Sequence, residues 1–383
     1  MNIFCALCAL IAIIYFTSVA GYIVVSHPFA TNSKDFSVYN SINATITPTD
    51  SKAFTLDKVT QGIITFIGDN GNFGIVATDH GKLSIFTLSE QGIGTAIDSD
   101  FRPRKCYADS VTLNPTNINE AYILDVNTDG GICTLSIDAA GSITDGGLTI
   151  STASPAQLLF PPVVGVQLAI IVSLRGVVSL WDWSSHKSLL SVPAFDTVDR
   201  DDGLPDAVVA AATLTADGQY LLVLDNNAVT GSMRLSAMKV DWTQRTLVVA
   251  QVISNKKGSF NDPTAIIASP YNNAVLVSSA QGNALLRLSY NANAPDGTDP
   301  FELIGPIPIT TTNVQLPNTM LALPGSDAWA GLVCVAELSG IRTVQFQTDG
   351  SVLDYGLTNS GGKGGEDMSA IVGAIGVQPT VAR

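Results

Sequence analysis

The chain has 383 residues, of which 46% are hydrophobic and only 14% are charged, and its formal net charge is −14. This composition excludes an intrinsically disordered chain, which combines few apolar residues with many charges. The 19 basic residues form no cluster of the kind that neutralises phosphates, so we predict no nucleic-acid partner. The many turn-forming residues, 33 Gly and 18 Pro, favour a mainly β protein.

The chain begins with an uncharged apolar run from Ile3 to Val25. Such a run is either a signal peptide or a membrane anchor. Ser18 and Ala20 are small residues that suit a cleavage site, whereas the apolar run continues past Ala20 and no Lys or Arg precedes it. We therefore expect residues 1–26 to be a signal peptide or an N-terminal membrane anchor, with contact to a membrane only if this segment is retained. The body, residues 27–383, is expected to be secreted, periplasmic or at the cell surface.

The body contains three cysteines, Cys106, Cys133 and Cys334. An odd count leaves at least one thiol free or paired with another chain. Cys106 and Cys133 are close enough in sequence to form a disulfide, but buried apolar thiols are the favoured interpretation.

One pattern recurs along the body with a period of about fifty residues. Each copy has a Pro or acidic residue, an apolar run, a turn, a second apolar run, a Gly- or Asn-bearing turn and an alternating third run. Short runs rich in Val, Ile and Leu that are bounded by turn residues predict strands. The copies are expected to begin near residues 62, 108, 155, 204, 262, 316 and 365.

A repeat of this length with about four strands predicts a propeller blade. Six complete copies fit between residues 60 and 358, and the seventh, from Glu366, has room for only one or two strands. Segments 36–47 and 52–58 would supply the remaining strands. The expected fold class is therefore all-β: one seven-bladed β-propeller domain of four-stranded antiparallel blades, with a ring closed by strands from both termini. Two β-sandwich domains or a right-handed β-helix are the alternatives, and the near-constant period disfavours both.

Several phrases of the sequence resemble the YVTN/lactonase-type seven-bladed propeller repeats. Residues 125–132 and 135–138 are similar to that family's second and third strands, and residues 215–218 and 347–351 to its inter-strand turns. The resemblance extends over most of residues 60–380 and implies the propeller fold. The family includes 6-phosphogluconolactonase and carboxymuconate-lactonising enzymes, which tend to use His, Arg and Glu at the ring mouth, often with a Gly-Pro-Arg-His-type phrase. Residues 102–105 are the nearest match to that phrase, with Lys105 in place of the histidine.

The repeat predicts which residues gather on one face of the ring. Acidic or amide residues stand at the entry to the innermost strands, and the last four of them are 56, 56 and 49 residues apart: Asp109, Asp206, Asp262, Asn318 and Asp367. Such a face can bind a ligand or a cation, and calcium prefers these oxygen ligands. Residues 125–130 also match the first half of an EF-hand calcium loop, with Ser136 in place of its final Glu. The alternative is that these side chains cap turns by accepting hydrogen bonds from nearby backbone N–H groups.

Three functional hypotheses follow from these observations. The leading hypothesis is a secreted or surface-anchored propeller that acts as a binding module through its acidic loop face, with a protein or carbohydrate as its partner. The alternative, implied by the resemblance, is a lactonase-like enzyme that opens or closes a lactone ring at the mouth of the central channel. Its first candidates for acid–base catalysis and oxyanion stabilisation are His80, Arg104, Lys105 and Glu337. A self-assembling ring protein is a third hypothesis.

Overall fold

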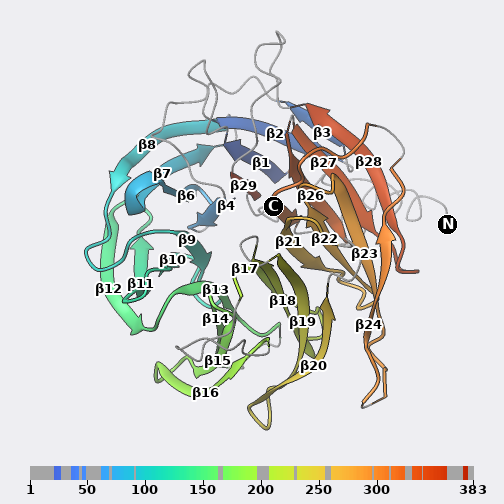
Figure 1. Cartoon of the computed structure of the whole chain (residues 1–383). Coiled ribbons are helices and arrows are strands. Elements are labelled where there is room, and N and C mark those ends of the chain that lie inside the picture. The colour runs from blue at the N-terminus through green and yellow to red at the C-terminus, as the bar shows by residue number, and fades with distance from the viewer. Residues whose placement is uncertain are drawn as a thin grey trace, which may run out of the picture.

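The regular secondary structure of the described residues is almost entirely β-strand, and the strands radiate as separate sheets around a common centre (Figure 1). The computed structural model describes residues 21–26, 36–42, 45–48, 62–68, 71–89, 92–162, 167–195, 207–227, 231–254, 260–295, 297–309, 312–323, 330–338, 340–359 and 374–377. Within these segments the only helix is the short 3-10 helix η1 (Asp79–Gly81), and no helix has the length and apolar character needed to cross a bilayer.

Six sheets have four antiparallel strands that follow one another along the chain, as in a propeller blade. We number these blades from one to six in chain order. Blade 1 comprises β5 (Thr65–Ile67), β6 (Phe73–Thr78), β7 (Lys82–Ser89) and β8 (Gly92–Phe101). Blade 2 comprises β9 (Ser110–Leu113), β10 (Glu120–Asp125), β11 (Gly131–Ile137) and β12 (Ile143–Ser151). Blade 3 comprises β13 (Pro155–Leu159), β14 (Leu168–Ser173), β15 (Val177–Asp182) and β16 (Lys187–Pro193).

The other three blades repeat the same order of strands. Blade 4 comprises β17 (Val209–Leu214), β18 (Tyr220–Asn227), β19 (Ser232–Asp241) and β20 (Thr246–Ser254). Blade 5 comprises β21 (Pro263–Ala268), β22 (Ala274–Ser279), β23 (Ala284–Tyr290) and β24 (Phe301–Pro306). Blade 6 comprises β25 (Met320–Ala322), β26 (Leu332–Glu337), β27 (Gly340–Phe346) and β28 (Val352–Asn359).

The expectation of seven such blades is corrected to six. The remaining sheet has five strands in the order β3-β2-β1-β29-β4 and is not a four-stranded antiparallel blade. Its strands are β1 (Gly21–Ser26), β2 (Phe36–Ile42), β3 (Thr45–Pro48), β4 (Gly62–Ile63) and β29 (Ala374–Val377). β29 pairs antiparallel with β1 but parallel with β4, so three separate parts of the chain meet in this sheet. The segment 52–58 and the blade start near residue 365 lie outside the described residues.

The hydrophobic core lies between neighbouring blades. The second strand of each blade is buried on both faces, and for this reason β14 and β22 are continuous apolar runs that end in serine. Buried side chains of adjacent blades form joint clusters, such as Ile75 of blade 1 with Ile123 of blade 2. Because each blade is sandwiched by its neighbours, the core fixes the blades and leaves the loops at the two ends of the strands on the surface.

The antiparallel order determines which loops share a face. The loops that lead into each innermost strand lie on the same side as the loops between the second and third strands. We call this side the entry face, and it carries every described candidate site residue. The turns between the third and fourth strands lie on the opposite face.

Candidate functional site

The entry face is organised by polar residues at the ends of the second strands. Asp225 Oδ1 accepts a hydrogen bond of 2.9 Å from Val208 N, and Ser279 Oγ one of 3.1 Å from Asn261 N. In blade 2, Asp125 Oδ2 accepts a bond of 2.8 Å from Tyr107 N. Each of these side chains therefore fixes the loop that enters its own blade, and their oxygens are occupied by that role.

Glu337 belongs to the same set but lies in a closed ionic network. The residue is only 1% exposed, and Arg342, which donates from Nε to Glu337 Oε1, is 0% exposed. Arg342 Nη1 donates to both oxygens of Asp354 at 3.0 Å, and Nη2 donates to Thr312 O at 2.6 Å. Burial raises the pKa of Glu337, and the bonds from Arg342 oppose that rise. The structure thus places Glu337 in an internal anchor of the loop that enters blade 6.

Blade 4 has a related ion pair. Arg234 Nε and Nη2 donate to Asp225 Oδ2 at 3.0 and 2.9 Å, and its guanidinium lies 4.6 Å from the centre of the Phe195 ring. An arginine of the third strand thus again binds the carboxylate at the end of the second strand. The repeated arrangement indicates that these carboxylates serve the architecture of the entry face.

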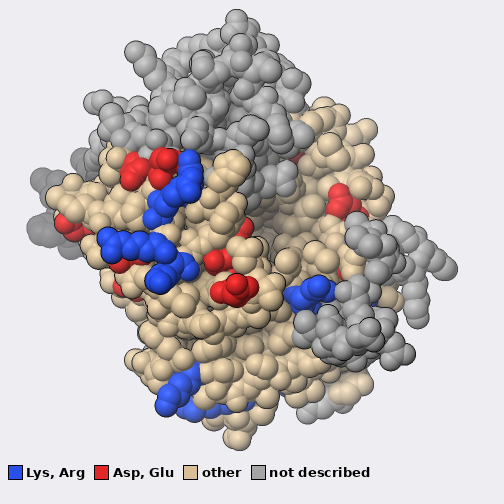
Figure 2. All heavy atoms as spheres, turned by 60° about the vertical axis from the view of Figure 1, so that its left-hand side comes forward, with Lys and Arg blue, Asp and Glu red and all other residues tan. Residues whose placement is uncertain are grey.

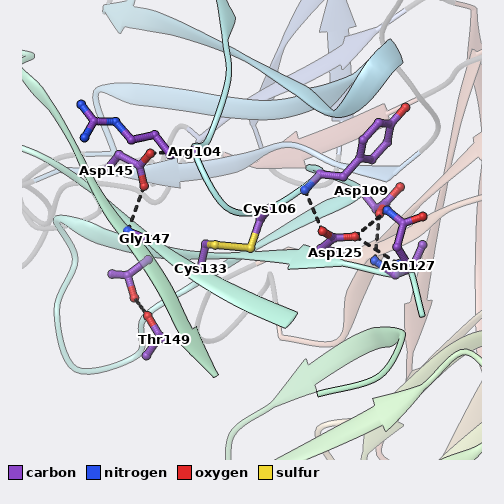
Figure 3. The surroundings of a disulfide bond; sticks show 12 residues. Arg104, Cys106, Asp109, Asp125, Asn127, Cys133, Asp145, Gly147 and Thr149 are labelled. Atoms are coloured by element: carbon purple, nitrogen blue, oxygen red, sulfur yellow. Dashed lines mark hydrogen bonds between the residues drawn. A yellow bond between two sulfur atoms is a disulfide. The ribbon is translucent and has the colours of Figure 1, made fainter. Parts of the chain in front are cut away.

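The loop into blade 2, residues 102–109, crosses this blade from its outermost strand to its innermost one, and we call it the radial segment. Arg104 N donates to Asp145 Oδ2 of β12 at 2.8 Å, and Cys106 forms a disulfide with Cys133 of β11. Tyr107 N then bonds Asp125 of β10. Figure 3 shows these contacts following one another along the segment.

The disulfide corrects the interpretation of Cys106 and Cys133 as free buried thiols. Cys106 stands in the radial segment and Cys133 faces it from β11, with their Cα atoms 6.2 Å apart. A sequence separation of 27 residues did not reveal this pairing, because it depends on the loop crossing over its own blade. Cys334 is a buried free thiol, which agrees with the odd count of cysteines in the body.

His80 lies beside the inner end of the radial segment. It is the exposed central residue of η1, with a left-handed φ of 67°. Ala108 N donates to Gly81 O at 3.1 Å, which joins η1 to the radial segment. A Cβ atom on Gly81 would lie 2.4 Å from Tyr107 Cγ, so the tyrosine ring packs directly against this glycine. His80 therefore forms one local group with Tyr107, Ala108 and Asp109.

Asp109 ends this group. It is partly buried, and its Oδ2 accepts a hydrogen bond of 2.9 Å from Val126 N. Burial raises its pKa, the bond from Val126 lowers it, and the neighbouring charge of Asp125 raises it, so that the pKa lies above the ordinary value. A carboxyl group of this kind at an exposed loop face is a candidate for proton transfer.

The other predicted binding positions do not occupy one equivalent place. Asp262 has a φ of 56° and accepts a bond of 2.7 Å from Asn226 Nδ2. The Asp262 carbonyl accepts a hydrogen bond from Ala280 N, and in blade 3 the Ser154 carbonyl accepts one from Leu174 N in the same way. Asp262 therefore occupies in blade 5 the position that Ser154 occupies in blade 3. Asn318 instead donates its backbone N–H to Ala336 O. Asp206 and Asp367 lie outside the described residues.

Among the residues whose placement is described, no group of three or more His, Cys, Asp and Glu side chains is arranged to hold a metal ion. The EF-hand-like residues 125–130 form a turn in which Asp125 Oδ1 accepts from both the backbone and the side chain of Asn127. A Cβ on Gly130 would lie 2.1 Å from Asp125 O, so the glycine permits a close backbone approach. These contacts are those of a capped turn.

Arg104 and Lys105 are exposed in the outer part of the radial segment, whereas His80 and Asp109 lie at its inner end. Glu337 belongs to blade 6, and the structure does not bring it together with the other predicted catalytic residues. Figure 2 shows basic and acidic side chains side by side on the surface it displays, without a continuous acidic area.

The sequence did not single out Tyr107 or Asp354, whereas the position of Arg342 just after a second-to-third-strand loop favours its pairing with a neighbouring acidic residue, as the structure shows with Glu337. Asp354 is far from Glu337 in sequence, and only the pairing of β26, β27 and β28 brings both carboxylates to Arg342.

Comparisons with known proteins extend the description of the fold. No protein-family model matches the sequence, and no curated protein is detectably similar to it. Among solved structures, a periplasmic gluconolactonase from Pseudomonas aeruginosa is similar, with a TM-score of 0.65 and 11% identity over 94% of this chain and 100% of that one. A protein from Bacteroides uniformis described as a candidate 6-phosphogluconolactonase has a TM-score of 0.64 and 12% identity, over 94% and 99%. A protein from Lactobacillus plantarum has the same TM-score, identity and coverage. At these identities the likeness establishes the shared β-propeller fold over nearly the whole chain.

Proposed function

We propose that the protein is an enzyme that hydrolyses a lactone, the alternative function considered from the sequence. The observation that carries this proposal is the likeness over the full length of the chain to propellers described as a gluconolactonase and a candidate 6-phosphogluconolactonase. A binding role for the acidic loop face has less support, because Asp125, Asp225 and Glu337 use their oxygens to hold loops of the same chain.

The proposed site is the local group of His80, Tyr107 and Asp109. His80 is an exposed imidazole and Asp109 a carboxyl group with a raised pKa, and the bond between Ala108 N and Gly81 O holds their backbones together. In lactone hydrolysis, water attacks the carbonyl carbon while a base takes its proton. The bond between that carbon and the ring oxygen then breaks, and an acid protonates the departing oxygen. We assign the base to His80 and the acid to Asp109.

The test is hydrolysis of five- and six-membered sugar lactones by the full chain, followed by acid release above the spontaneous rate. We expect His80→Gln and Asp109→Asn each to lower kcat/KM by about 10²-fold or more, as loss of an acid–base group does. His186→Gln and Asp299→Asn are matched controls, because both residues are exposed in third-to-fourth-strand turns on the opposite face and should leave the rate unchanged. No rate above the spontaneous one for any lactone would refute the proposal.

Asp109→Asn has a second, independent readout. A pKa raised in the folded state means that the ionised carboxylate is less stable there than in the unfolded chain, so its contribution to stability falls as the pH rises through the folded pKa. Asparagine removes this charge, and its amide oxygen can still accept the bond from Val126 N. We therefore expect an unchanged or higher melting temperature at neutral pH together with lost activity. A lowered melting temperature would instead assign Asp109 a structural role.

We also infer that the five-stranded sheet takes the place of a seventh blade and that the body is exported. The pairing of β29 with β1 supports closure of the ring by both ends of the chain. A disulfide supports an oxidising compartment, and one structural neighbour is described as periplasmic. Cleavage of the leader after Ala20 would retain β1, which begins at Gly21.

A further inference from the structure

The outer part of the radial segment presents cations that the proposed hydrolysis does not use. Arg102, Arg104 and Lys105 are all exposed within four consecutive residues of a chain whose net charge is −14. Among the described residues, no side chain forms an ion pair with any of the three. Their charges are therefore available to a ligand in solution.

Two carboxylates of the adjoining strands, Asp145 and Asp100, already have other partners. Asp145 accepts from Arg104 N at 2.8 Å with one oxygen and from Gly147 N at 2.9 Å with the other. Asp100 forms an ion pair with Lys82. These acidic groups reduce the local positive potential, but their contacts are with backbone amides and with a different cation. Figure 3 shows Arg104 extending away from the Asp145 carboxylate that its own backbone binds.

The segment is also held rigidly. Arg104 N, the Cys106–Cys133 disulfide and Tyr107 N attach it to three successive strands of blade 2. Ordering a binding loop in advance lowers the entropy lost when a ligand binds. A loop that is anchored on both sides of Lys105 is therefore suited to recognition.

Tyr107 adds an aromatic surface next to the cations. Its ring packs against Gly81 and is 44% exposed, which leaves part of the ring open to solvent. A tyrosine combines a large apolar face with a polar tip, which suits contact with a sugar ring. The guanidinium group of arginine binds a carboxylate through two parallel hydrogen bonds.

We propose that residues 102–107 bind an acidic saccharide, with Arg102, Arg104 and Lys105 contacting its carboxylates and Tyr107 contacting a sugar ring. The narrow line of cations followed by one ring fits an oligosaccharide better than a protein, whose stable interface needs on the order of 1,000 Å². Nucleic acid is disfavoured, because its binding rests on many phosphate contacts and residues 102–107 supply only three cations. This inference does not depend on the proposed lactone hydrolysis.

The experiment is calorimetric titration of the oxidised full chain with an oligogalacturonate, its methyl ester and an oligoglutamate of equal length. We expect saturable binding of the oligogalacturonate that weakens with salt, and about tenfold or more weaker binding of the other two, since one lacks charge and the other lacks sugar rings. Equal binding of the methyl ester would overturn the role of the cations. Equal binding of the oligoglutamate would overturn the assignment to a saccharide, and absence of saturable binding would overturn the site.

Two variants with the same loss of charge locate the site. Arg104→Gln combined with Lys105→Gln should weaken binding about tenfold or more, as expected when charge-assisted hydrogen bonds are lost. Lys187→Gln combined with Arg245→Gln removes two exposed cations from the opposite face and should leave the affinity within about twofold. Equal losses in both double variants would indicate attraction to the overall charge and would overturn the proposal.

The last test concerns the disulfide and the rigidity that it gives the radial segment. Cys106→Ser combined with Cys133→Ser keeps every charge but releases the middle of the radial segment, so we expect weaker binding in a variant that still melts cooperatively. Unchanged affinity in that folded variant would overturn the contribution of the rigid segment. If this variant does not fold, Tyr107→Ala in the oxidised chain tests the same surface, and unchanged affinity would overturn the contact with a sugar ring.

Discussion

At the scale of single residues, the entry face depends on charges that are buried and fully partnered. Arg342 binds Glu337, Asp354 and the carbonyl of Thr312 from a position with no solvent exposure. A buried ion network contributes little net stability against an apolar replacement, but loss of one member leaves charges without partners in a poorly solvated site. Loss of Arg342 should therefore destabilise the fold by more than the small net stability of the whole ion network would suggest.

We expect Arg342→Ala to lower the free energy of unfolding by about 3–5 kcal/mol, because two buried carboxylates lose their partner. Arg342 opposes the burial that raises the pKa of Glu337, so that pKa rises further in the variant. A folded-state pKa above the unfolded one means that stability is retained at low pH and lost as the pH rises. The deficit should therefore grow from about pH 5 to about pH 8 in urea unfolding. Arg245→Ala, at an exposed turn, is the control and should hardly change the free energy of unfolding. A loss for Arg342→Ala that is as small as that of the control, or that does not change with pH, would contradict the role of Arg342 as the partner of buried carboxylates.

At the scale of elements, the apolar runs of the sequence predicted the second strands well. Residues 220–224 and 274–277 are apolar runs of this kind and lie in β18 and β22, since a strand buried on both faces is apolar over most of its length. The five-stranded sheet could not be derived in this way, since pairing between distant parts of the chain leaves no local pattern. The same limit applies to the site: the repeat placed Asp109, Asp262 and Asn318 on the entry face, but only the backbone hydrogen bonds show that Asp262 and Asn318 occupy different positions in their blades.

Substitution of Ser279, the last residue of β22, measures how much a polar residue at the end of a second strand contributes to the free energy of unfolding. Ser279 is 1% exposed, and its Oγ accepts from Asn261 N at 3.1 Å and donates to Asn261 O at 2.7 Å. Ser279→Ala removes both bonds from the loop that enters blade 5, and we expect a loss of about 1–3 kcal/mol in chemical unfolding. Ser289→Ala is the matched control in the same blade, because its hydroxyl has only a contact of 3.5 Å with Glu302 O. A loss no larger than that of the control would contradict the anchoring role.

At the scale of the whole molecule, the blades follow one another around a common centre (Figure 1), and buried clusters join neighbouring blades, such as blade 1 with blade 2 and blade 3 with blade 4. In such an arrangement the sheet that combines the N-terminal strands β1, β2 and β3 with the C-terminal strand β29 determines whether strand edges stay unpaired. β29 pairs with β1 at Ile375, Gly376 and Val377 and with β4 at Ala374 and Ile375. This single strand therefore joins the N-terminal strands to the start of blade 1.

Removal of β29 should lower thermal stability and promote association, whereas removal of only the residues after β29 should do neither. Deletion of residues 372–383 leaves β1 and β4 without their common neighbour, so we expect the melting temperature to fall by about 5 °C or more and the protein to associate through the uncovered edges. Deletion of residues 378–383 retains β29 and should leave both properties unchanged. Thermal melting and light scattering at several protein concentrations distinguish the two truncated forms, because edge-to-edge association depends on concentration and loss of intramolecular packing does not. Equal melting temperatures and monomeric behaviour in both would mean that β29 does not close the ring, and the six regular blades would then be stable without it.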